Sequence, residues 1–292
     1  MIKDSLKYNI KDILQYDNNI QYSINLEMDY KKENKLKEYI HTYKSVEIIN
    51  EVLCSFKSDT TKNKSKIIIG PYGKGKSYVA LYIMNLINDN NRKQNKYYNS
   101  LLDKAKELDN KVYLNIKAFI NSDERYLPVV LNSNIYDKGI DELFIYSLKQ
   151  ALELNDLDEI ELDFYFEKAI DKIERWKLNY KETFKKFKDL IDRDINIFIK
   201  ELKSYNSNTY KQFKKVYKEI MSGEEFNPYY EINLINTYID ASKKIKKAGY
   251  TGIYVLCDEF SKYMEYLIAK DLILDVKKLQ DFAELCNRSN KD

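Results

Sequence analysis

Histidine and cysteine are scarce in this chain of 292 residues. The single histidine, His41, excludes a metal site built from two histidines and argues against a Ser/His/Asp triad, which would need it as its only base. Three cysteines, Cys54, Cys257 and Cys286, lie far apart with no Cys-x-x-Cys pair. They cannot build a disulfide framework or a thiolate zinc site, and they are typical of a reducing cytoplasm.

Long hydrophobic runs and a strong charge of one sign are also missing. No stretch approaches the roughly 18 apolar residues of a membrane-spanning helix, and the start of the chain lacks a hydrophobic signal core. Lys and Arg total 49 against 46 Asp and Glu, so the net charge is only +3 and gives no global signature of polyanion binding. We therefore expect a cytoplasmic protein with no membrane partner.

Glycine and proline are rare and unevenly placed. The chain has 7 glycines and 3 prolines, yet Gly70, Pro71, Gly73 and Gly75 fall close together. Glycine adopts backbone angles that a side chain would forbid. We therefore expect this one loop to need an unusual backbone shape.

Hydrophobic residues make up 44% of the sequence, which is enough to bury a sizeable core. Apolar runs predict strands at Lys66–Ile69, Leu127–Asn132 and Ile253–Cys257, and alternation predicts a short strand over Ile20, Tyr22, Ile24 and Leu26. Helical periodicity predicts helices at 36–56, Ser77–Asn88, 100–121 (where Lys111–Ile116 also fits a strand), Ile140–Leu154, much of 157–247, and 272–286. Strands that alternate with helices favour an α/β protein with a parallel sheet.

Residues 70–77 read G-P-Y-G-K-G-K-S and match the phosphate-binding P-loop pattern G-x-x-x-x-G-K-[ST]. Backbone N–H groups of such a loop form an anion site, and the N-terminus of the following helix adds its positive end. Lys76 would neutralise the β- and γ-phosphates, and the Ser77 hydroxyl is a suitable ligand for Mg²⁺. The predicted ATP-binding residues are Gly70, Pro71, Tyr72, Gly73, Lys74, Gly75, Lys76 and Ser77.

A carboxylate for the metal is expected at the end of the strand Ile253–Cys257, which is followed by Asp258 and Glu259. An aspartate at the carboxyl end of a buried parallel strand reaches the crevice at that edge of the sheet. We expect Asp258 to hold Mg²⁺ together with Ser77. Glu259 would orient and deprotonate the attacking water, so Glu259 and Lys76 are the predicted catalytic residues.

The two motifs resemble those of P-loop ATPases of the additional-strand, catalytic-glutamate division, which contains the AAA+ proteins. Residues 70–77 are similar to its Walker A motif, and I-Y-V-L-C-D-E-F at 253–260 is similar to its Walker B motif. The acidic residue after the Walker B aspartate, here Glu259, implies ATP hydrolysis. More loosely, L-P-V-V-L-N at 127–132 and K-L-Q-D-F-A-E-L-C-N-R-S at 278–289 resemble the large ATP-binding proteins of bacterial phage-defence islands, which implies a role in antiviral defence.

This resemblance implies a three-layer P-loop NTPase sandwich with a parallel sheet and an inserted helical subdomain. The domains would be a lead-in and helix at 1–65, the first part of the core at 66–156, inserted helices at 157–248, and the Walker B strand with its following helix at 249–292. In that division a further strand lies between the P-loop strand and the Walker B strand, but only one helix is predicted after Glu259. We therefore expect an incomplete sheet, the N-terminal part of a longer protein, and a homo-oligomer or partner protein that supplies the missing elements.

A basic segment suggests another partner. Lys172–Lys218 holds 14 Lys and Arg against 6 acidic residues, interleaved with aromatic residues such as Trp176, Tyr180 and Phe213. Basic helices with aromatics bind nucleic acids by following phosphates and stacking bases. The same pattern also fits helices with an aromatic buried stripe and a solvated lysine-rich face.

The leading hypothesis is a cytoplasmic, Mg²⁺-dependent ATPase module that couples ATP turnover to a conformational change. Two alternatives stay open: a switch that binds nucleotide and turns over little, and a nucleotide-dependent module whose basic helices bind nucleic acid. An arginine acting on a neighbouring subunit's nucleotide would come from a set of five, Arg92, Arg125, Arg175, Arg193 and Arg288.

Overall fold

The computed structural model describes residues 24–57, 63–131, 139–160, 162–204, 206–228 and 233–289. Two strands lie within these ranges, β1 (Tyr126–Leu131) and β2 (Gly252–Cys257). The helices before β2 are α2 (Leu26–Asp29), α3 (Glu33–Glu38), α4 (Tyr43–Ser55), α5 (Lys76–Asn88), the 3-10 helix η1 (Lys96–Tyr98), α6 (Asn99–Leu108), α7 (Asn110–Ile120), α8 (Ile140–Leu154), α9 (Asp163–Asn179), α10 (Lys181–Ile191), α11 (Ile195–Lys203), α12 (Ser207–Ile220) and α13 (Leu234–Lys247). After β2 come α14 (Phe260–Ala269) and α15 (Ile273–Arg288).

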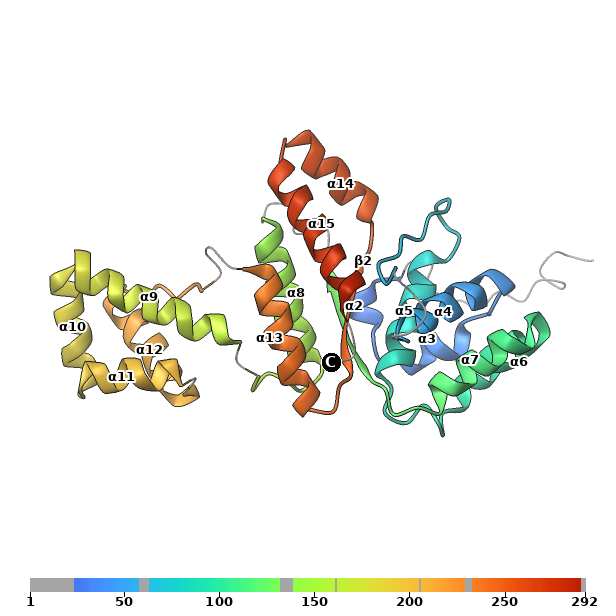
Figure 1. Ribbon diagram of the computed structural model, residues 1–292, viewed down its shortest axis with the longest axis horizontal. Helices are drawn as coiled ribbons and strands as arrows, with labels where there is room; N and C mark the ends of the chain where they lie inside the picture. Colours follow the sequence, from blue (N-terminus) through green and yellow to red (C-terminus); the bar gives the residue numbers. More distant parts are fainter. Residues whose placement is uncertain are drawn as a thin grey trace, which may run out of the picture.

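The molecule is elongated, and its small sheet lies near the middle (Figure 1). Helices α3 to α7 gather on one side of the sheet, while α8, α13 and α15 cover the other side (Figure 1). Helices α9 to α12 form a separate group at the far end (Figure 1). The sheet therefore separates two helical layers, and a third helical group extends from one of them.

The predicted three-layer P-loop sandwich is wrong. The described residues are mostly helical, and their only sheet is a parallel pair in which Tyr126 lies opposite Gly252 and Leu131 opposite Cys257. Residues 66–69, predicted as a strand, have no strand partner in the described ranges. A strand needs a neighbour to accept and donate its ladder hydrogen bonds, so this β-branched segment alone does not make one.

Both faces of the strand pair are covered by helices. Ile253, Val255 and Cys257 pack against a core shared with α8, α13 and α15. Tyr254 faces a second core built by α4 to α7, and Leu256 faces α2 and α5. Alternating side chains point to opposite faces of a strand, so the continuous apolar run of β2 is explained by helices that contact both faces, although its residues are only half-buried.

Several predicted elements are confirmed. Helix α8 has the predicted bounds, β1 and β2 each begin one residue before the predicted strand, and Lys111–Ile116 lies in α7. The predicted helix at 36–56 is instead two helices, because Thr42 and Ser45 form a reciprocal capping box that begins α4. Leu26 lies in a helix rather than the predicted N-terminal strand, of which Ile20 and Tyr22 are outside the described residues.

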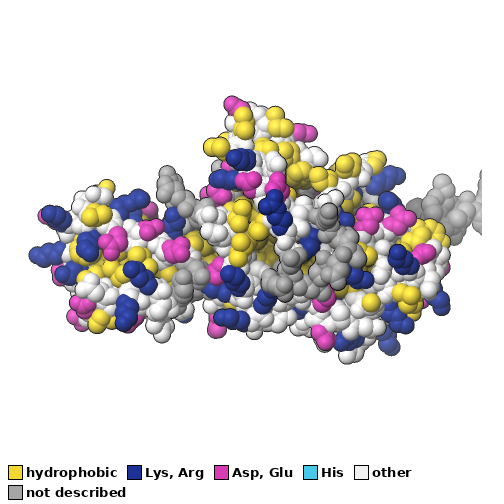
Figure 2. Space-filling model, viewed as in Figure 1, with side chains coloured by type: hydrophobic (Ala, Val, Ile, Leu, Met, Phe, Trp, Pro, Cys, Tyr) yellow, Lys and Arg dark blue, Asp and Glu magenta, His cyan; other side chains and the backbone are white. Residues whose placement is uncertain are grey.

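Two helices follow Glu259, where only one was predicted. Helix α14 was missed because its apolar residues do not all face a core: Ile268 is 70% exposed. Ile273 and Leu274, at the start of α15, are similarly exposed. Figure 2 shows apolar side chains gathered on this projecting pair of helices, at the top of the view.

Helices α9 to α12 enclose a core of their own. Trp176, Phe187, Phe198 and Phe213 are all buried in it. The interpretation of this segment as helices with an aromatic buried stripe is confirmed for these rings, which are unavailable to stack on bases. Figure 2 shows the Lys and Arg side chains of this group dispersed among acidic ones.

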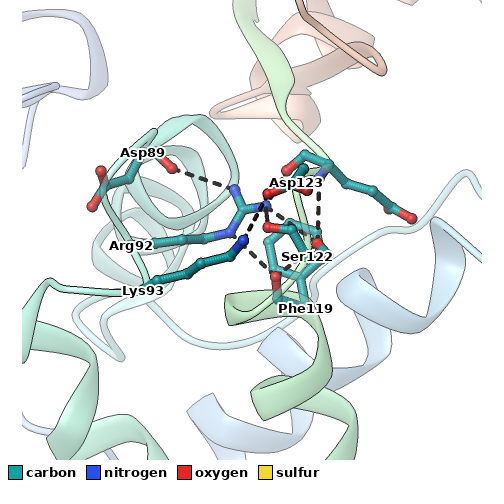
Figure 3. A network of polar contacts seen from close by, with 7 residues as sticks. Asp89, Arg92, Lys93, Phe119, Ser122 and Asp123 are labelled. Carbon is teal, nitrogen blue, oxygen red and sulfur yellow. Dashed lines mark hydrogen bonds and ion pairs between the residues drawn. The ribbon is translucent and has the colours of Figure 1, made fainter.

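Arg92 lies in the turn after α5 and hydrogen-bonds to backbone carbonyls between the end of α7 and the start of β1. Its guanidinium is almost fully buried, with Nε donating to the Phe119 carbonyl at 3.2 Å and Nη2 donating to the Ser122 carbonyl at 2.9 Å (Figure 3). Another Nη2 hydrogen bond goes to the Glu124 carbonyl. Arg92 therefore satisfies backbone carbonyls inside this layer, which makes it unsuitable as an arginine for a neighbouring subunit.

His41 lies in the segment between α3 and α4, within the single helix predicted for 36–56, and it is buried. Its ring packs edge-on against Tyr39 and Tyr82, with centroid distances of 4.8 and 4.6 Å. Neither ring nitrogen has a hydrogen-bond partner among the described residues. Burial disfavours the imidazolium and lowers the pKa of His41 to about 4.

This burial predicts a loss of stability in mild acid. The unfolded chain binds a proton on His41 as pH falls through 6.5, whereas the folded chain does so only near pH 4. Unfolding should therefore become about 2 kcal/mol easier between pH 7.5 and pH 5 through this group. His41→Phe should remove that part of the pH dependence in urea unfolding, and an unchanged pH dependence in the variant would contradict the assignment.

Candidate functional site

The loop 70–77 has the backbone shape that its glycines predict. Gly73 and Gly75 have φ angles of +75° and +76°, in the left-handed region, and α5 begins at Lys76 with Gly75 as its N-cap. Gly75 has no side chain to cap the helix, so the first N–H groups of α5 keep their capacity to bind an anion. The loop itself is exposed to solvent.

Lys76 closes this loop onto itself. Its Nζ donates to the carbonyl oxygens of Gly70 and Pro71, each at 2.8 Å. An ammonium group has three N–H donors, so two carbonyls leave one donor for another acceptor. The arrangement places a positive charge over the loop, beside the start of α5.

The structure brings Ser77 and Asp258 together although 181 positions separate them in sequence. The Ser77 Oγ donates to Asp258 Oδ1 at 3.3 Å, and both residues are half-buried. Asp258 directly follows β2, and Ser77 is the second residue of α5. The helix N-terminus and the carboxyl end of the strand therefore meet at one point, with two oxygen groups of the kind that Mg²⁺ prefers.

Glu259 lies next to this contact but is paired with another residue. Its backbone is left-handed, with φ +52°, and its N–H donates to Asp258 Oδ1 at 3.0 Å. Its carboxylate accepts from the Lys262 ammonium at 2.6 Å. A non-glycine residue in this conformation costs free energy, and such strain is common at functional sites. Lys262 was missed by the sequence reasoning, although its spacing of three residues on α14 is the usual signal of a pair.

The other predicted loop residues make fewer contacts. Tyr72 is 97% exposed, and Pro71 and Lys74 are also exposed. Before the loop, Ser65 is tied to α15, because its N–H donates to Asn287 Oδ1 at 2.9 Å and its hydroxyl to the Ala283 carbonyl. Asn287 thus holds the residues that precede the loop 70–77. No pattern in the sequence predicted this role.

Cys257 and Arg288 have surroundings that limit the chemistry they can perform. Burial, with the nearby charge of Asp258, raises the pKa of the Cys257 thiol to about 12, so Cys257 stays a protonated, unreactive thiol. Arg288 lies at the end of α15, where its side chain is 82% exposed and pairs with Glu284 at 3.3 Å. This surface pair leaves the arginine on the outside of the molecule.

Within the described ranges, no three His, Cys, Asp or Glu side chains converge as a metal site. Ser77 and Asp258 provide two oxygen groups at the loop, so a metal ion there would need further oxygen ligands from a bound ligand or water. None of the helices in the described ranges has the length and apolarity to cross a bilayer. No protein-family model, curated protein or solved structure matches this chain.

The loop geometry predicts that Gly75→Ala is costly for conformational reasons alone. A Cβ at Gly75 would meet nothing within 4 Å, so the cost comes from the left-handed backbone and should be about 1 kcal/mol in urea unfolding. Gly139→Ala is the matched control, because Gly139 also precedes a helix but has φ −60° and open space around it. The control should change stability by about 0.5 kcal/mol or less. Equal costs for both variants would contradict the left-handed assignment.

Proposed function

We propose that this protein binds ATP with Mg²⁺ at the loop 70–77 and hydrolyses it, coupling turnover to a conformational change. The proposal rests on one observation, the hydrogen bond between Ser77 and Asp258 at the N-terminus of α5. A hydroxyl and a carboxylate at the mouth of an anion-binding loop fit a magnesium–phosphate ligand. The glycine pattern and Lys76 support the same ligand.

Each residue has a distinct part in this proposal. Backbone N–H groups between Tyr72 and Ser77 bind the phosphates, and the free donor of Lys76 neutralises the terminal one. Ser77 and Asp258 hold Mg²⁺, which supplies charge stabilisation when bound. Glu259 accepts the proton of the attacking water on its carboxylate.

A switch with little turnover is the second candidate, and the Glu259–Lys262 pair favours it. While Lys262 holds the carboxylate at 2.6 Å, Glu259 is occupied by a competing donor. The difference between the two candidates is whether this pair opens when nucleotide binds. In the switch, the pair persists and hydrolysis stays slow.

Lys262→Gln tests that difference. If the pair restrains Glu259, the variant should hydrolyse ATP several-fold faster than the wild type with similar ATP affinity. Phosphate release measured at saturating ATP gives the rate. Identical rates in the two proteins would show that the pair does not limit turnover and would remove the support for the switch.

We further propose that the module works in the cytoplasm with a partner protein or a second copy. A role in antiviral defence is supported only by the resemblance of residues 127–132 and 278–289 to ATP-binding proteins of phage-defence islands. The free thiols of Cys54, Cys257 and Cys286 support a reducing compartment. The exposed Ile67 and Ile69 before the loop, 69% and 90% accessible, support an additional contact at this side of the molecule.

Substitution of Lys76 and Glu259 tests the main proposal. Lys76→Ala should weaken Mg²⁺–ATP binding at least about tenfold, because a charge-assisted hydrogen bond is lost. Glu259→Gln should bind ATP like the wild type but hydrolyse it on the order of 10²–10⁴-fold more slowly. Isothermal titration and phosphate release measure the two effects.

Two control variants show whether the effects depend on the positions of Lys76 and Glu259. Lys188→Ala on α10 and Glu265→Gln on α14 remove exposed side chains of the same types away from the loop, and both variants should behave like the wild type. If Lys76→Ala binds ATP as well as Lys188→Ala does, the loop is not the ATP site. If Glu259→Gln hydrolyses ATP at the wild-type rate, Glu259 is not the base.

A further inference from the structure

A cavity lies at the opposite end of α5 from the loop 70–77. Its volume is about 630 Å³, and it is lined by residues around α2 and α3, the end of α5 and the turn after it, and Arg125 before β1. Helix α5 has 13 residues, which corresponds to a length of about 20 Å. The cavity is therefore separate from the proposed nucleotide site.

Amide side chains dominate the cavity wall. They come from the last turn of α5 and the turn that follows it, and they are Asn85, Asn88, Asn90, Asn91, Gln94 and Asn95. The amides of Asn85, Asn88 and Asn95 already make hydrogen bonds within the fold. Those of Asn90, Asn91 and Gln94 are left to donate to and accept from the hydroxyl groups of a ligand. Tyr30, Tyr97 and Tyr98 add aromatic surface.

Arg125 is held in a fixed orientation at this cavity. Its Nε donates to the Asn88 carbonyl and to Asn88 Oδ1, at 2.9 and 3.0 Å. Its guanidinium carbon lies 4.2 Å from the centre of the Tyr250 ring. Within the described part of the chain, neither terminal nitrogen of Arg125 has a hydrogen-bond partner. A guanidinium fixed in this way presents a free fork that matches two oxygens of one anion.

The Asn88 that orients Arg125 is itself fixed by buried polar groups. Its amide donates to Asn155 Oδ1 at 2.7 Å and also to the Tyr30 hydroxyl. Asn155 in turn donates to the Ala151 carbonyl at 2.7 Å. These contacts are buried, so the position of Arg125 is set by the fold before any ligand binds.

Lys31 provides a second positive charge at the cavity. Its backbone is left-handed, with φ +64°, and Asn85 Oδ1 accepts its N–H at 3.1 Å. Its Nζ donates to the Leu154 carbonyl at 2.6 Å and keeps two further donors. Partial burial and the charge of Arg125 lower the pKa of Lys31, while Asp156 opposes this effect. Lys31 and Arg125 are thus two cations beside one cavity, and Asp156 offsets part of the charge at Lys31.

The acids of the lining are already held by tyrosines. Asp89 Oδ2 accepts from the Tyr98 hydroxyl at 3.0 Å, and Glu33 Oε2 accepts from the Tyr97 hydroxyl at 2.8 Å. With Lys96, the lining has three cations against these two carboxylates, so an anion is favoured overall. The carboxylates are also suitable acceptors for ligand hydroxyl groups.

We propose that this cavity is a binding site for a phosphorylated sugar. The phosphate would bind the fork of Arg125 with the help of Lys31, and the hydroxyl groups would bind the amides of Asn90, Asn91 and Gln94 and the carboxylates of Glu33 and Asp89. The proposal is independent of the nucleotide site at the loop 70–77.

Ribose 5-phosphate is the probe for this proposal, titrated into the full chain at pH 7.5 by isothermal titration and ligand-observed NMR. The wild type should bind it saturably at millimolar concentration or below, and Arg125→Gln should weaken binding about tenfold or more. Uncharged ribose should bind at least about tenfold more weakly. Arg175→Gln, which changes an exposed arginine of α9, should bind like the wild type.

Two further variants, Lys76→Ala and Lys31→Gln, distinguish binding at the cavity from binding at the loop and from a loss of folding. Lys76→Ala should leave binding of ribose 5-phosphate unchanged, because the loop is not involved. If circular dichroism shows that Arg125→Gln is unfolded, Lys31→Gln replaces it and should weaken binding several-fold. The proposal is overturned if the wild type shows no saturable binding at millimolar concentration, if the cavity variant binds as tightly as the wild type, or if Lys76→Ala abolishes binding.

Discussion

The hydrogen bond from Ser77 Oγ to Asp258 Oδ1 joins the two parts of the chain on which the proposed chemistry depends. One partner lies at the positive end of α5 and the other at the carboxyl end of β2, and each position is set by buried apolar packing behind it. The polar groups meet because helix and strand pack against the same cores. Without the contact between Ser77 and Asp258, the loop would be an anion site that lacks a metal ligand from another part of the chain.

The local elements around this contact were predictable because they depend on local chemistry. The glycines at 73 and 75 indicate a loop of unusual backbone shape, the apolar pattern of Ser77–Asn88 indicates a buried helix, and the apolar run Ile253–Cys257 indicates a strand. The structure has the predicted helix and strand at these places, and both glycines are left-handed. The proximity of Asp258 to Ser77 follows from the direction of a parallel strand and its flanking helix.

The two-stranded sheet and the cavity at the far end of α5 could not be predicted from local patterns. Whether Lys66–Ile69 becomes a strand depends on a neighbouring strand, which periodicity does not contain. The Glu259–Lys262 pair needs the start of α14, whose exposed apolar residues obscure its helical pattern. The cavity at the other end of α5 combines asparagines from one turn with Arg125 and Lys31, and only the fold shows that these polar residues converge.

A double-mutant cycle on Ser77 and Asp258 measures whether these two side chains hold one Mg²⁺ ion. ATP affinity is measured with and without Mg²⁺ for the wild type, Ser77→Ala, Asp258→Asn and the double variant, and only the Mg²⁺-dependent part of the affinity is compared. If the two groups hold one metal ion, each single change should remove most of that part and the double variant should lose little more. Losses that simply add, or an Mg²⁺ effect that survives both changes, would contradict the account.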